Sequence, residues 1–533
     1  MNVTWDSTEK IWSGPPRTSM YNKDTSLGII VFNTMRNYPK NVIQISDTDG
    51  IVVTNEMAIT WAVRIAQQLK KRGLDHQSVV GIVAKNSTYV MPVGVACLLN
   101  TTPFHAVSPI FDEATLKYMF EITKPAMIFC DGEVYDTVRE ATKDWSPEII
   151  IISHPIDGLP SIENMLAQTN DLPVMLYEPE PLKNGSDQTV AILCSSGTTG
   201  LPKAVCISNS VLIEDNLLVN GETIFFVNSG IDWISGLWAF MFCILFGSTR
   251  IISENPFSAE YFVQLVKKYK ITYATLAPIQ LAAICACKDA TPFALSSMRN
   301  LNYGGGILSQ AILLRIQELF KNITYTSGYG MTEAGMITMK IGVQNAATAG
   351  QPIPGVRLRI VDESGNSLGH NEVGEIYVHN GKAWNGYYGN PNATRQIRDS
   401  DGWIHTGDLG YIDNDNNLNI IDRKKETLKY QGIHYWPTEI ENAILELPQV
   451  KAVCVVGVPD ELIGDIAGAL VLKHQDCEIS AKEIIDHVAK RLSLFAKHLH
   501  AGVRFTDKLP FNSNGKYVRK TALEMFKALN CQE

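Results

Sequence analysis

A chain of 533 residues exceeds the length at which a single hydrophobic core stops growing, so we expect more than one domain. The composition, 45% hydrophobic and 19% charged, excludes an intrinsically disordered chain and is typical of a globular protein of enzyme size. A net charge of −9 gives no general reason to expect nucleic acid as a partner.

Cysteine spacing and apolar stretches bear on metal sites, disulfides and location. The ten cysteines are scattered without a C-x-x-C pair, which argues against a zinc site and a disulfide framework. Residues 233–249 are uncharged but too few to span a bilayer, so we predict a buried helix there and no stable membrane span. Residues 1–10 lack the apolar core of a signal peptide, and the chain ends without a peroxisomal tripeptide. We therefore expect a cytoplasmic location.

Taken in order, the chain alternates between two hydrophobic periodicities. Residues 57–72 have apolar side chains at helical spacing, and Gly73 is placed to end that helix. Short apolar runs at 79–83, 126–130 and 148–152 read as buried strands, with helical runs between them. Strands interleaved with helices predict an α/β fold with mainly parallel sheets.

The first motif with chemical content is Ser-Ser-Gly-Thr-Thr-Gly-Leu-Pro-Lys at residues 195–203. It follows the apolar run 189–194, which reads as a strand. Its glycines allow backbone N–H groups to approach an anion, and its hydroxyls and Lys203 add donors and positive charge, so the motif suits a polyphosphate. It is not a Walker loop, because Pro202 precedes the lysine. The alternative is a flexible Ser/Gly turn.

Two further glycine-rich blocks follow. Residues 302–309 (NYGGGILS) would let a flat group lie against bare backbone. In residues 326–333 (TSGYGMTE), Tyr329 offers a ring for stacking, Thr332 a hydroxyl, and Glu333 a hard oxygen ligand for Mg²⁺. Taken alone, each block also fits a tight surface turn.

Three later blocks carry charge. In residues 402–410 (GWIHTGDLG), the Asp408 carboxylate can accept two hydrogen bonds, as a ribose diol requires. Residues 422–432 (DRKKETLKYQG) are basic, and in residues 509–516 (LPFNSNGK) a loop presents Lys516. The structural alternatives are an Asp in a β-turn, a solvated charged surface and an exposed tail lysine.

In this order, the motifs resemble those of the adenylate-forming superfamily, which comprises acyl-CoA synthetases, beetle luciferases and adenylation domains. The resemblance runs from about residue 86 to residue 516 and is closest to the insect-luciferase and 4-coumarate–CoA ligase branch. It implies a large N-terminal AMP-binding domain of several subdomains, residues 1–424. It also implies a small mobile α/β C-terminal domain, residues 425–533, that carries a catalytic lysine.

The resemblance also implies roles for individual residues. Those expected to be catalytic are Lys516, Lys203, Thr332 and Glu333, with Glu333 as the Mg²⁺ ligand. Those expected to bind ATP or AMP are Ser195, Ser196, Gly197, Thr198, Thr199, Gly200, Lys203, Gly304, Gly305, Gly306, Ser327, Gly328, Tyr329, Gly330, Thr332, Asp408, Ile420, Arg423 and Lys516.

By the same resemblance, Lys425 is the hinge between the domains, and Lys429 and Gly432 lie on the approach of coenzyme A. The expected acyl pocket is formed by Trp233, Met331, Met336 and Ile337, together with Gly304 and Gly328. Trp233 stands near the position where luciferases and many plant-type ligases have a histidine, which weakens the light-emitting interpretation. These side chains suggest an apolar acid, and no obvious acidic counter-charge for an α-amino group stands among them.

The leading hypothesis is an ATP-dependent acid–CoA ligase that uses ATP, Mg²⁺ and CoA. An apolar fatty or aryl carboxylate would attack the α-phosphorus of ATP, and the acyl-adenylate would then become an acyl-CoA thioester. One alternative is a luciferase-type adenylating monooxygenase, and another is a non-catalytic nucleotide-binding relative. The particular acid and the oligomeric state stay open at this stage.

Overall fold

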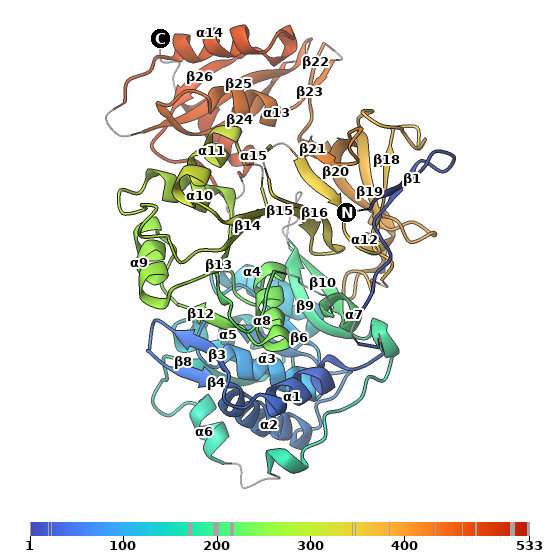
Figure 1. The fold of residues 1–533 in the computed structure, drawn as a ribbon, viewed down its shortest axis with the longest axis vertical. Coiled ribbons are helices and arrows are strands. Elements are labelled where there is room, and N and C mark those ends of the chain that lie inside the picture. The colour runs from blue at the N-terminus through green and yellow to red at the C-terminus, as the bar shows by residue number, and fades with distance from the viewer. Residues whose placement is uncertain are drawn as a thin grey trace.

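The computed structural model describes residues 2–529 apart from residues 20, 23, 169–172, 196–201, 214–217, 307, 344, 347, 383, 432, 461, 475–476 and 512–516. The fold is mixed α/β, with a large, sheet-rich N-terminal part and a small C-terminal domain at the top of Figure 1. The α/β class expected from the sequence is confirmed.

A six-stranded sheet, counted over the described residues, forms one half of the N-terminal part. Its strands, in spatial order, are β10 (Lys203–Ser208), β9 (Thr189–Ser195), β6 (Phe104–Ala106), β5 (Val80–Val83), β7 (Met127–Asp131) and β8 (Glu148–Ser153). All neighbours are parallel except β10 and β9. The strands predicted near residues 79–83, 126–130, 148–152 and 189–194 are thus confirmed.

The helices of this half are α1 (Leu27–Asn37), α2 (Asn55–Lys71), α3 (Val90–Leu99), α4 (Glu113–Thr123), α5 (Tyr135–Thr142), α6 (Ile162–Ala167) and α7 (Asn209–Leu212), with the 3-10 turns η1 (Gly132–Val134), η2 (Val174–Leu176) and η3 (Gly185–Asp187).

Helix α2 shows how local sequence sets an element's ends. The Thr54 side chain accepts a hydrogen bond from the Met57 N–H at the first turn. The side chains of Ala58, Ala62 and Leu69 are buried on one face, as the apolar spacing indicates. Gly73 has φ of +74°, a conformation that ends the helix and suits glycine. The predicted helix over 57–72 is therefore confirmed, with a slightly earlier start.

A second, long sheet contains fifteen strands in the part of the chain that the structure describes. In spatial order they are β1 (Thr4–Asp6), β2 (Ile11–Ser13), β18 (Arg357–Val361), β19 (Gly374–His379), β20 (Ile404–Ile412), β21 (Leu418–Arg423), β17 (Thr348–Pro352), β16 (Gly335–Ile341), β15 (Thr324–Met331), β14 (Asn300–Gly304), β13 (Tyr273–Leu276), β11 (Ile224–Val227), β12 (Thr249–Ile252), β3 (Val42–Ser46) and β4 (Val52–Thr54). Its helices are α8 (Ile234–Phe246), α9 (Ala259–Tyr269), α10 (Pro278–Ala286), α11 (Gln310–Leu319) and α12 (Pro391–Ile397).

The long sheet is parallel in one part and antiparallel in the other. Strands β3, β12, β11, β13, β14 and β15 are parallel neighbours, as the alternation with helices predicts. From β15 through β16, β17 and β21 to β18, neighbouring strands are antiparallel, which differs from mainly parallel sheets. The reason is connection length: a turn of a few residues, such as the one between β15 and β16, can join only antiparallel neighbours.

Helix α8 is the buried helix predicted within residues 233–249. The side chains of Leu237, Phe240 and Met241 are at most 1% exposed and belong to the main core. None of the helices among the described residues is long and apolar enough to cross a membrane.

The C-terminal domain has a separate core and a separate sheet. Strands β22 (Leu428–Tyr430), β23 (Ile433–Tyr435), β24 (Val450–Asp460), β25 (Gly464–Lys473) and β26 (Gly502–Phe505) form it, with α13 (Pro437–Ile444), α14 (Ala481–Arg491), α15 (Arg519–Ala528) and the 3-10 turn η5 (Phe495–Lys497). The boundary expected between residues 424 and 425 falls in the 3-10 turn η4 (Lys424–Glu426), which separates β21 from β22. That boundary stays a prediction.

Candidate active site

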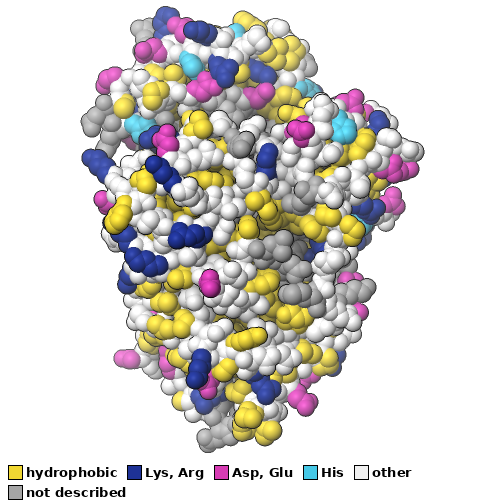
Figure 2. All heavy atoms as spheres, viewed as in Figure 1, with side chains coloured by type: hydrophobic (Ala, Val, Ile, Leu, Met, Phe, Trp, Pro, Cys, Tyr) yellow, Lys and Arg dark blue, Asp and Glu magenta, His cyan; other side chains and the backbone are white. Residues whose placement is uncertain are grey.

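A cleft of about 1720 Å³ runs through the N-terminal part and reaches residues 423–425, at the start of the C-terminal domain. It is lined from the carboxyl ends of β5, β6 and β9 in one sheet and from β11 and β13–β16 in the other. Figure 2 shows apolar side chains in the middle of one face of the molecule, below the C-terminal domain. Carboxyl ends of parallel strands meeting in a crevice are the usual position of a ligand site in α/β proteins.

The cleft collects many of the predicted site residues. Those in its lining are Ser195, Lys203, Trp233, Gly304, Gly305, Gly328, Gly330, Met331, Thr332, Glu333, Met336, Arg423 and Lys425. Those described by the structure but not in its lining are Gly306, Ser327, Tyr329, Ile337, Asp408, Ile420 and Lys429. Ser196, Gly197, Thr198, Thr199, Gly200, Gly432 and Lys516 fall outside the described residues.

One end of the cleft brings together a cation, an aromatic ring and a carboxylate. Antiparallel pairing of β10 with β9 sets Lys203 opposite Ser195. The Lys203 Nζ lies 4.7 Å from the centre of the Tyr387 ring. The Tyr387 hydroxyl donates a hydrogen bond of 2.8 Å to Glu333 Oε1, and both residues are nearly buried. Burial, and then the Glu333 carboxylate, raise the pKa of Tyr387, so its hydroxyl stays a donor at neutral pH. The Tyr387 side chain thus contacts Lys203 through its ring and Glu333 through its hydroxyl.

Sequence reasoning missed Tyr387, which lies 54 residues from Glu333 and 184 from Lys203 along the chain. Its position depends on the bridge between Tyr387 and Val205 and on a hydrogen bond from the Tyr387 N–H to Thr394 Oγ1. The only local signal is an aromatic pair, Tyr387 and Tyr388, between two glycines, and such a pair is common in ordinary turns.

For the Mg²⁺-dependent adenylation that the sequence resemblance implies, we expect Tyr387→Phe to raise the Mg²⁺ concentration needed for half-maximal activity and to lower kcat/KM by about 10- to 100-fold, because a hydrogen bond to a charged group is lost. Phenylalanine keeps the aromatic ring that contacts the Lys203 ammonium group and removes only the hydroxyl that donates to Glu333. Acid-dependent pyrophosphate exchange over a Mg²⁺ titration measures it. Tyr388→Phe is the matched control and should match the parent protein. An unchanged Mg²⁺ requirement in Tyr387→Phe would contradict the orienting role.

A metal ion at Glu333 would need ligands beyond the protein. The described residues contain no group of three or more His, Cys, Asp or Glu side chains that could hold a metal ion. Within the part of the chain that the structure describes, Glu333 accepts one hydrogen bond, from Tyr387, which leaves carboxylate lone pairs available there. Mg²⁺ is often bound by one or two carboxylates together with substrate phosphates. The single carboxylate therefore fits a metal that arrives with a triphosphate.

A second polar group, Asp408 with its two partners, lies next to the cleft wall. Asp408 on β20 pairs with Arg423 on β21, and the Arg423 Nε lies 2.6 Å from Asp408 Oδ1. The Tyr329 hydroxyl donates a hydrogen bond of 2.6 Å to Asp408 Oδ2. Burial, and then Asp408, raise the pKa of Tyr329 well above its ordinary value. Gly407 and Arg423 line the cleft beside Asp408. Tyr329 and Arg423 therefore hold the Asp408 carboxylate in position from two sides, directly behind the residues that line the cleft.

Glycines allow neighbouring backbone segments to approach closely in this wall. A Cβ on Gly330 would lie 2.6 Å from the Gly335 carbonyl oxygen, and a Cβ on Gly304 would lie 3.0 Å from that of Gly328. Gly305 has φ of +80°, which favours glycine. Glycine is therefore required at these positions, and Gly304, Gly305 and Gly330 all line the cleft. Their contact with a flat group stays a prediction.

Some of the expected acyl-pocket residues line the cleft, and one lies in the core. Trp233, Met331 and Met336 line the cleft, whereas Ile337 is fully buried in the main core. Met336 and Ile337 are neighbours on β16, and successive side chains of a strand point to opposite faces. This alternation places Ile337 in the core instead of the pocket.

The segment between β21 and β22, at residues 423–425, closes one side of the cleft. Arg423, Lys424 and Lys425 line it, and the Lys424 Nζ lies 2.7 Å from Glu375 Oε2. Lys429 is exposed on β22 of the C-terminal domain. Three basic residues, Arg423, Lys424 and Lys425, thus line the cleft where the N-terminal part meets the C-terminal domain.

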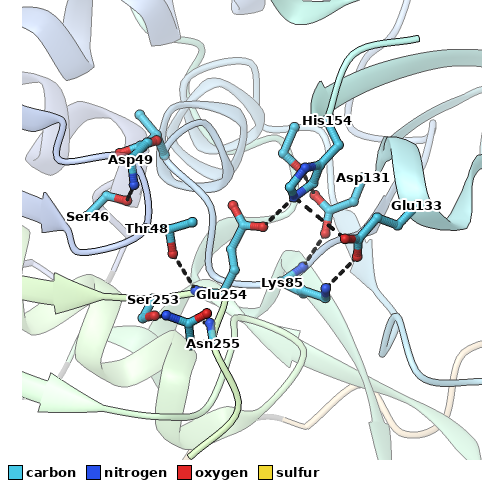
Figure 3. Close-up of polar contacts among 12 residues, drawn as sticks. Ser46, Thr48, Asp49, Lys85, Asp131, Glu133, His154, Ser253, Glu254 and Asn255 are labelled. Carbon is cyan, nitrogen blue, oxygen red and sulfur yellow. Dashed lines mark hydrogen bonds and ion pairs between the residues drawn. The ribbon is translucent and has the colours of Figure 1, made fainter. Parts of the chain in front are cut away.

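The opposite end of the cleft is bordered by an ion-pair network (Figure 3). His154 Nε2 lies 2.6 Å from Glu254 Oε2, and Lys85 contacts Glu133 and donates its main-chain N–H to Asp131. The hydrogen bond with Glu254 raises the pKa of His154. Lys85 and Glu254 both line the cleft, and they follow strands of different sheets. The network therefore joins the two sheets at this end.

Asp232 is a second residue that sequence reasoning missed. It lines the cleft beside Trp233, and Ser108 lines the cleft as well. Burial raises the pKa of this carboxyl to about 6. The available signal was that Asp232 is the only charged residue between Thr223 and Thr249. The apolar pocket expected from the sequence thus contains an acid.

Comparisons with known proteins agree with this geometry. The model of the AMP-binding enzyme family matches residues 32–388, well over half of the chain, and that of the AMP-binding enzyme C-terminal domain matches residues 439–516. The chain is 27% identical to 4-coumarate–CoA ligase 1 of Arabidopsis thaliana, over 93% of this chain and 91% of that protein. It is 30% identical to luciferin 4-monooxygenase of Photuris pensylvanica, over 89% and 90%.

Solved structures share the fold. An anthranilate CoA ligase in complex with anthranoyl-AMP matches with a TM-score of 0.86, 20% identity, 96% of this chain and 99% of that one. ATP-bound MatB from Rhodopseudomonas palustris matches with a TM-score of 0.84, 22% identity, 95% of this chain and 100% of that one. At these identities the likeness concerns the fold alone.

Proposed function

This chain belongs to the AMP-binding, adenylate-forming enzyme family, and from that membership we propose that it is an ATP-dependent ligase that joins a carboxylic acid to coenzyme A. The 4-coumarate–CoA ligases among its relatives support this reaction. The observation that carries the proposal is the meeting, in one cleft, of Lys203, Glu333 and Arg423 from motifs far apart in the sequence.

In the first half-reaction, a carboxylate oxygen of the acid bonds to the α-phosphorus of ATP. The bond from the α-phosphorus to the bridging oxygen breaks, and pyrophosphate leaves. No general base is needed, because a carboxylic acid is already ionised at neutral pH. The main requirement is to offset negative charge where two anions meet. Mg²⁺, when bound, supplies positive charge at the phosphates, and Glu333 would hold it.

The chain's own residues meet the rest of this requirement. Lys203, beside the start of the loop at residue 195, would contact the phosphates. Asp408 would accept hydrogen bonds from the ribose hydroxyls, with Tyr329 and Arg423 holding its carboxylate in place. The bare backbone at Gly304 and Gly330 would receive the adenine. Lys516 of the C-terminal domain is proposed to bridge the acid and the α-phosphate.

In the second half-reaction, the thiol sulfur of coenzyme A bonds to the acyl carbon. The bond from that carbon to the adenylate oxygen breaks, AMP leaves, and the thiol proton passes to solvent. We assign Lys425 as the hinge for a rotation of the C-terminal domain, with Lys429 and Gly432 on the thiol's approach. The exposed position of Lys429 on β22, outside the cleft in this arrangement, is compatible with such a rotation.

A panel of acids tests the proposal. Hexanoate, laurate, palmitate, benzoate, cinnamate and 4-coumarate are each incubated with ATP and Mg²⁺, with and without CoA, and AMP and acyl-CoA are quantified. We expect at least one acid to give AMP release that increases at least tenfold with CoA, together with its thioester. Light and oxygen uptake with luciferin, without a CoA requirement, would instead identify the monooxygenase. Pyrophosphate exchange independent of any acid would overturn both.

A further inference from the structure

We propose that the loop at residues 287–299, which joins α10 to β14, docks this protein reversibly onto an anionic membrane surface through Phe293 and the basic side chains around it. The inference goes beyond the proposed reaction, because the loop does not line the cleft. Such docking is peripheral and needs no membrane-spanning helix.

The loop holds one large apolar side chain out in solvent. The Phe293 side chain is 88% exposed. Four other apolar side chains of the loop are buried in the same core cluster as one face of α9, and they are Ala290, Ala294, Leu295 and Met298. These anchors stand on both sides of Phe293 in the sequence, so the ring is held away from the core. Its exposure therefore leaves about 10-fold or more in binding equilibrium available to a surface that buries it.

Hydrogen bonds fix the loop beside the ends of two helices. The Arg299 N–H donates to the Thr272 carbonyl oxygen at 2.7 Å, and the Ser297 hydroxyl donates to that of Ile271 at 2.8 Å. Both acceptors directly follow α9. The Thr324 N–H, just after α11, donates to the Arg299 carbonyl oxygen at 2.8 Å. The loop itself begins where α10 ends, so the C-terminal ends of α9, α10 and α11 lie together around it.

Exposed basic side chains gather at these helix ends. Those at or next to the ends, or in the loop, are Lys267, Lys270, Lys288, Arg299 and Lys321. Figure 2 shows Lys and Arg side chains spread over the side of the molecule where Figure 1 labels α9, α10 and α11. The exposed phenylalanine thus stands within a group of positive charges.

The charge of this region is opposite to that of the whole protein. Residues 259–322 contain seven Lys and Arg and three Asp and Glu, all exposed, which gives +4, whereas the full chain carries −9. Lys268 pairs with Asp47 at 2.7 Å. Within the described parts of the chain, the other six bases form no ion pair. Their positive charge is therefore available to an anionic surface.

Helix stability explains only part of this pattern. A cation near a helix C-terminus offsets the helix dipole, and Lys267 and Lys321 stand at such positions. Arg299 directly precedes strand β14, and Phe293 lies in a loop, so the dipole accounts for neither. A protruding aromatic ring with basic neighbours is the composition of segments that bind the interface of anionic bilayers.

A bilayer suits both parts of the surface. Lipid phosphates and carboxylates attract the bases, and each base near such a surface strengthens binding by about fivefold. The apolar ring enters the boundary between headgroups and acyl chains. An apolar carboxylic acid also concentrates in a bilayer, so docking would bring the ligase to its substrate, a point that rests on the proposed function.

Vesicle sedimentation with the full-length protein tests the docking. The vesicles contain either phosphatidylcholine alone or an equal mixture of phosphatidylcholine and phosphatidylserine, and neither ATP nor an acid is added. We expect binding to the mixed vesicles at least about tenfold stronger than to the neutral ones, with release at high salt because salt screens the exposed charges.

Two sets of variants locate the contact. Phe293→Ser should weaken binding to the mixed vesicles by about tenfold or more, and Lys288→Glu with Arg299→Glu by at least about 25-fold. Leu462→Ser is the control for the ring, because Leu462 is 96% exposed in the C-terminal domain. Lys490→Glu with Lys508→Glu is the control for charge, since it changes the net charge equally at exposed positions elsewhere. Both controls should bind as the parent protein does.

The outcomes separate docking from catalysis. None of the loop residues lines the cleft, so the loop variants should keep parent activity in solution, which also shows that they fold. Absence of vesicle binding, equal binding to both vesicle types, or equal loss in loop variants and controls would overturn the docking and leave the ligase proposal standing. A loop that captures a protein but no vesicle would overturn it as well. Failure of every acid in the panel would overturn the ligase proposal alone.

Discussion

Asp408→Ala is expected to lower kcat/KM for ATP by about 100- to 1000-fold, because the two hydrogen bonds that we propose between its carboxylate and the ribose hydroxyls would be lost. The structure adds a reason for a large effect. Tyr329 and Arg423 both bind the Asp408 carboxylate, at 2.6 Å each, so its removal also leaves a buried hydroxyl and a guanidinium without their partner. Initial rates of acid-dependent pyrophosphate exchange at varied ATP concentration measure the effect.

A modified nucleotide makes this test specific to the ribose. With 3′-deoxy-ATP the parent protein should lose about 10-fold or more in kcat/KM, since one hydrogen bond is missing, whereas Asp408→Ala should show no further loss. Asp415→Ala, a change of an exposed acid in the turn that follows β20, is the matched control and should keep parent activity. If both proteins discriminate equally against 3′-deoxy-ATP, Asp408 does not contact that hydroxyl.

Arg519→Ala is expected to lower the free energy of unfolding of the C-terminal domain by about 3–5 kcal/mol, because it leaves a buried carboxylate unpaired. Arg519 begins helix α15, and its side chain is 18% exposed. It lies 2.5 Å from Glu441 Oε1 and 2.7 Å from Glu426 Oε2, and it donates to the Val455 carbonyl oxygen at 2.7 Å. Glu441 also accepts the Val455 N–H, so the group links α13, β24, α15 and the hinge turn η4.

Urea unfolding followed by circular dichroism measures this loss. Arg491→Ala provides the control, because Arg491 pairs with Glu446 at 2.9 Å on the surface, with side chains 60% and 41% exposed. A surface ion pair contributes about 0–1 kcal/mol, so the control should unfold almost as the parent does. A loss for Arg519→Ala no larger than that of Arg491→Ala would show that the buried group does not stabilise the domain.

The features that local sequence alone determines, and that the structure confirms, depend on interactions within a few residues. The spacing of apolar side chains predicts α2, β5, β7 and β8 correctly, because burial of one helical face or a whole strand leaves a periodic pattern. Glycine is required at 304, 305 and 330, because Gly305 has a positive φ and a Cβ at Gly304 or Gly330 would meet neighbouring backbone. The motifs predicted a shared site for Lys203, Glu333 and Arg423, and all three line one cleft, while their roles stay predictions.

What only the tertiary structure decided depends on pairings between distant segments. The position of Tyr387 between Lys203 and Glu333 follows from the way the chain after β19 passes β10, which no local pattern encodes. The place of Ile337 in the core depends on which face of β16 meets the cleft, and a period of two allows either. Asp232 is an isolated acid in an apolar run, and its exposure to the cleft arises only because β6, β9 and the start of α8 converge. Side-chain chemistry is thus local, but the neighbours that give it a function are set by packing over long sequence separations.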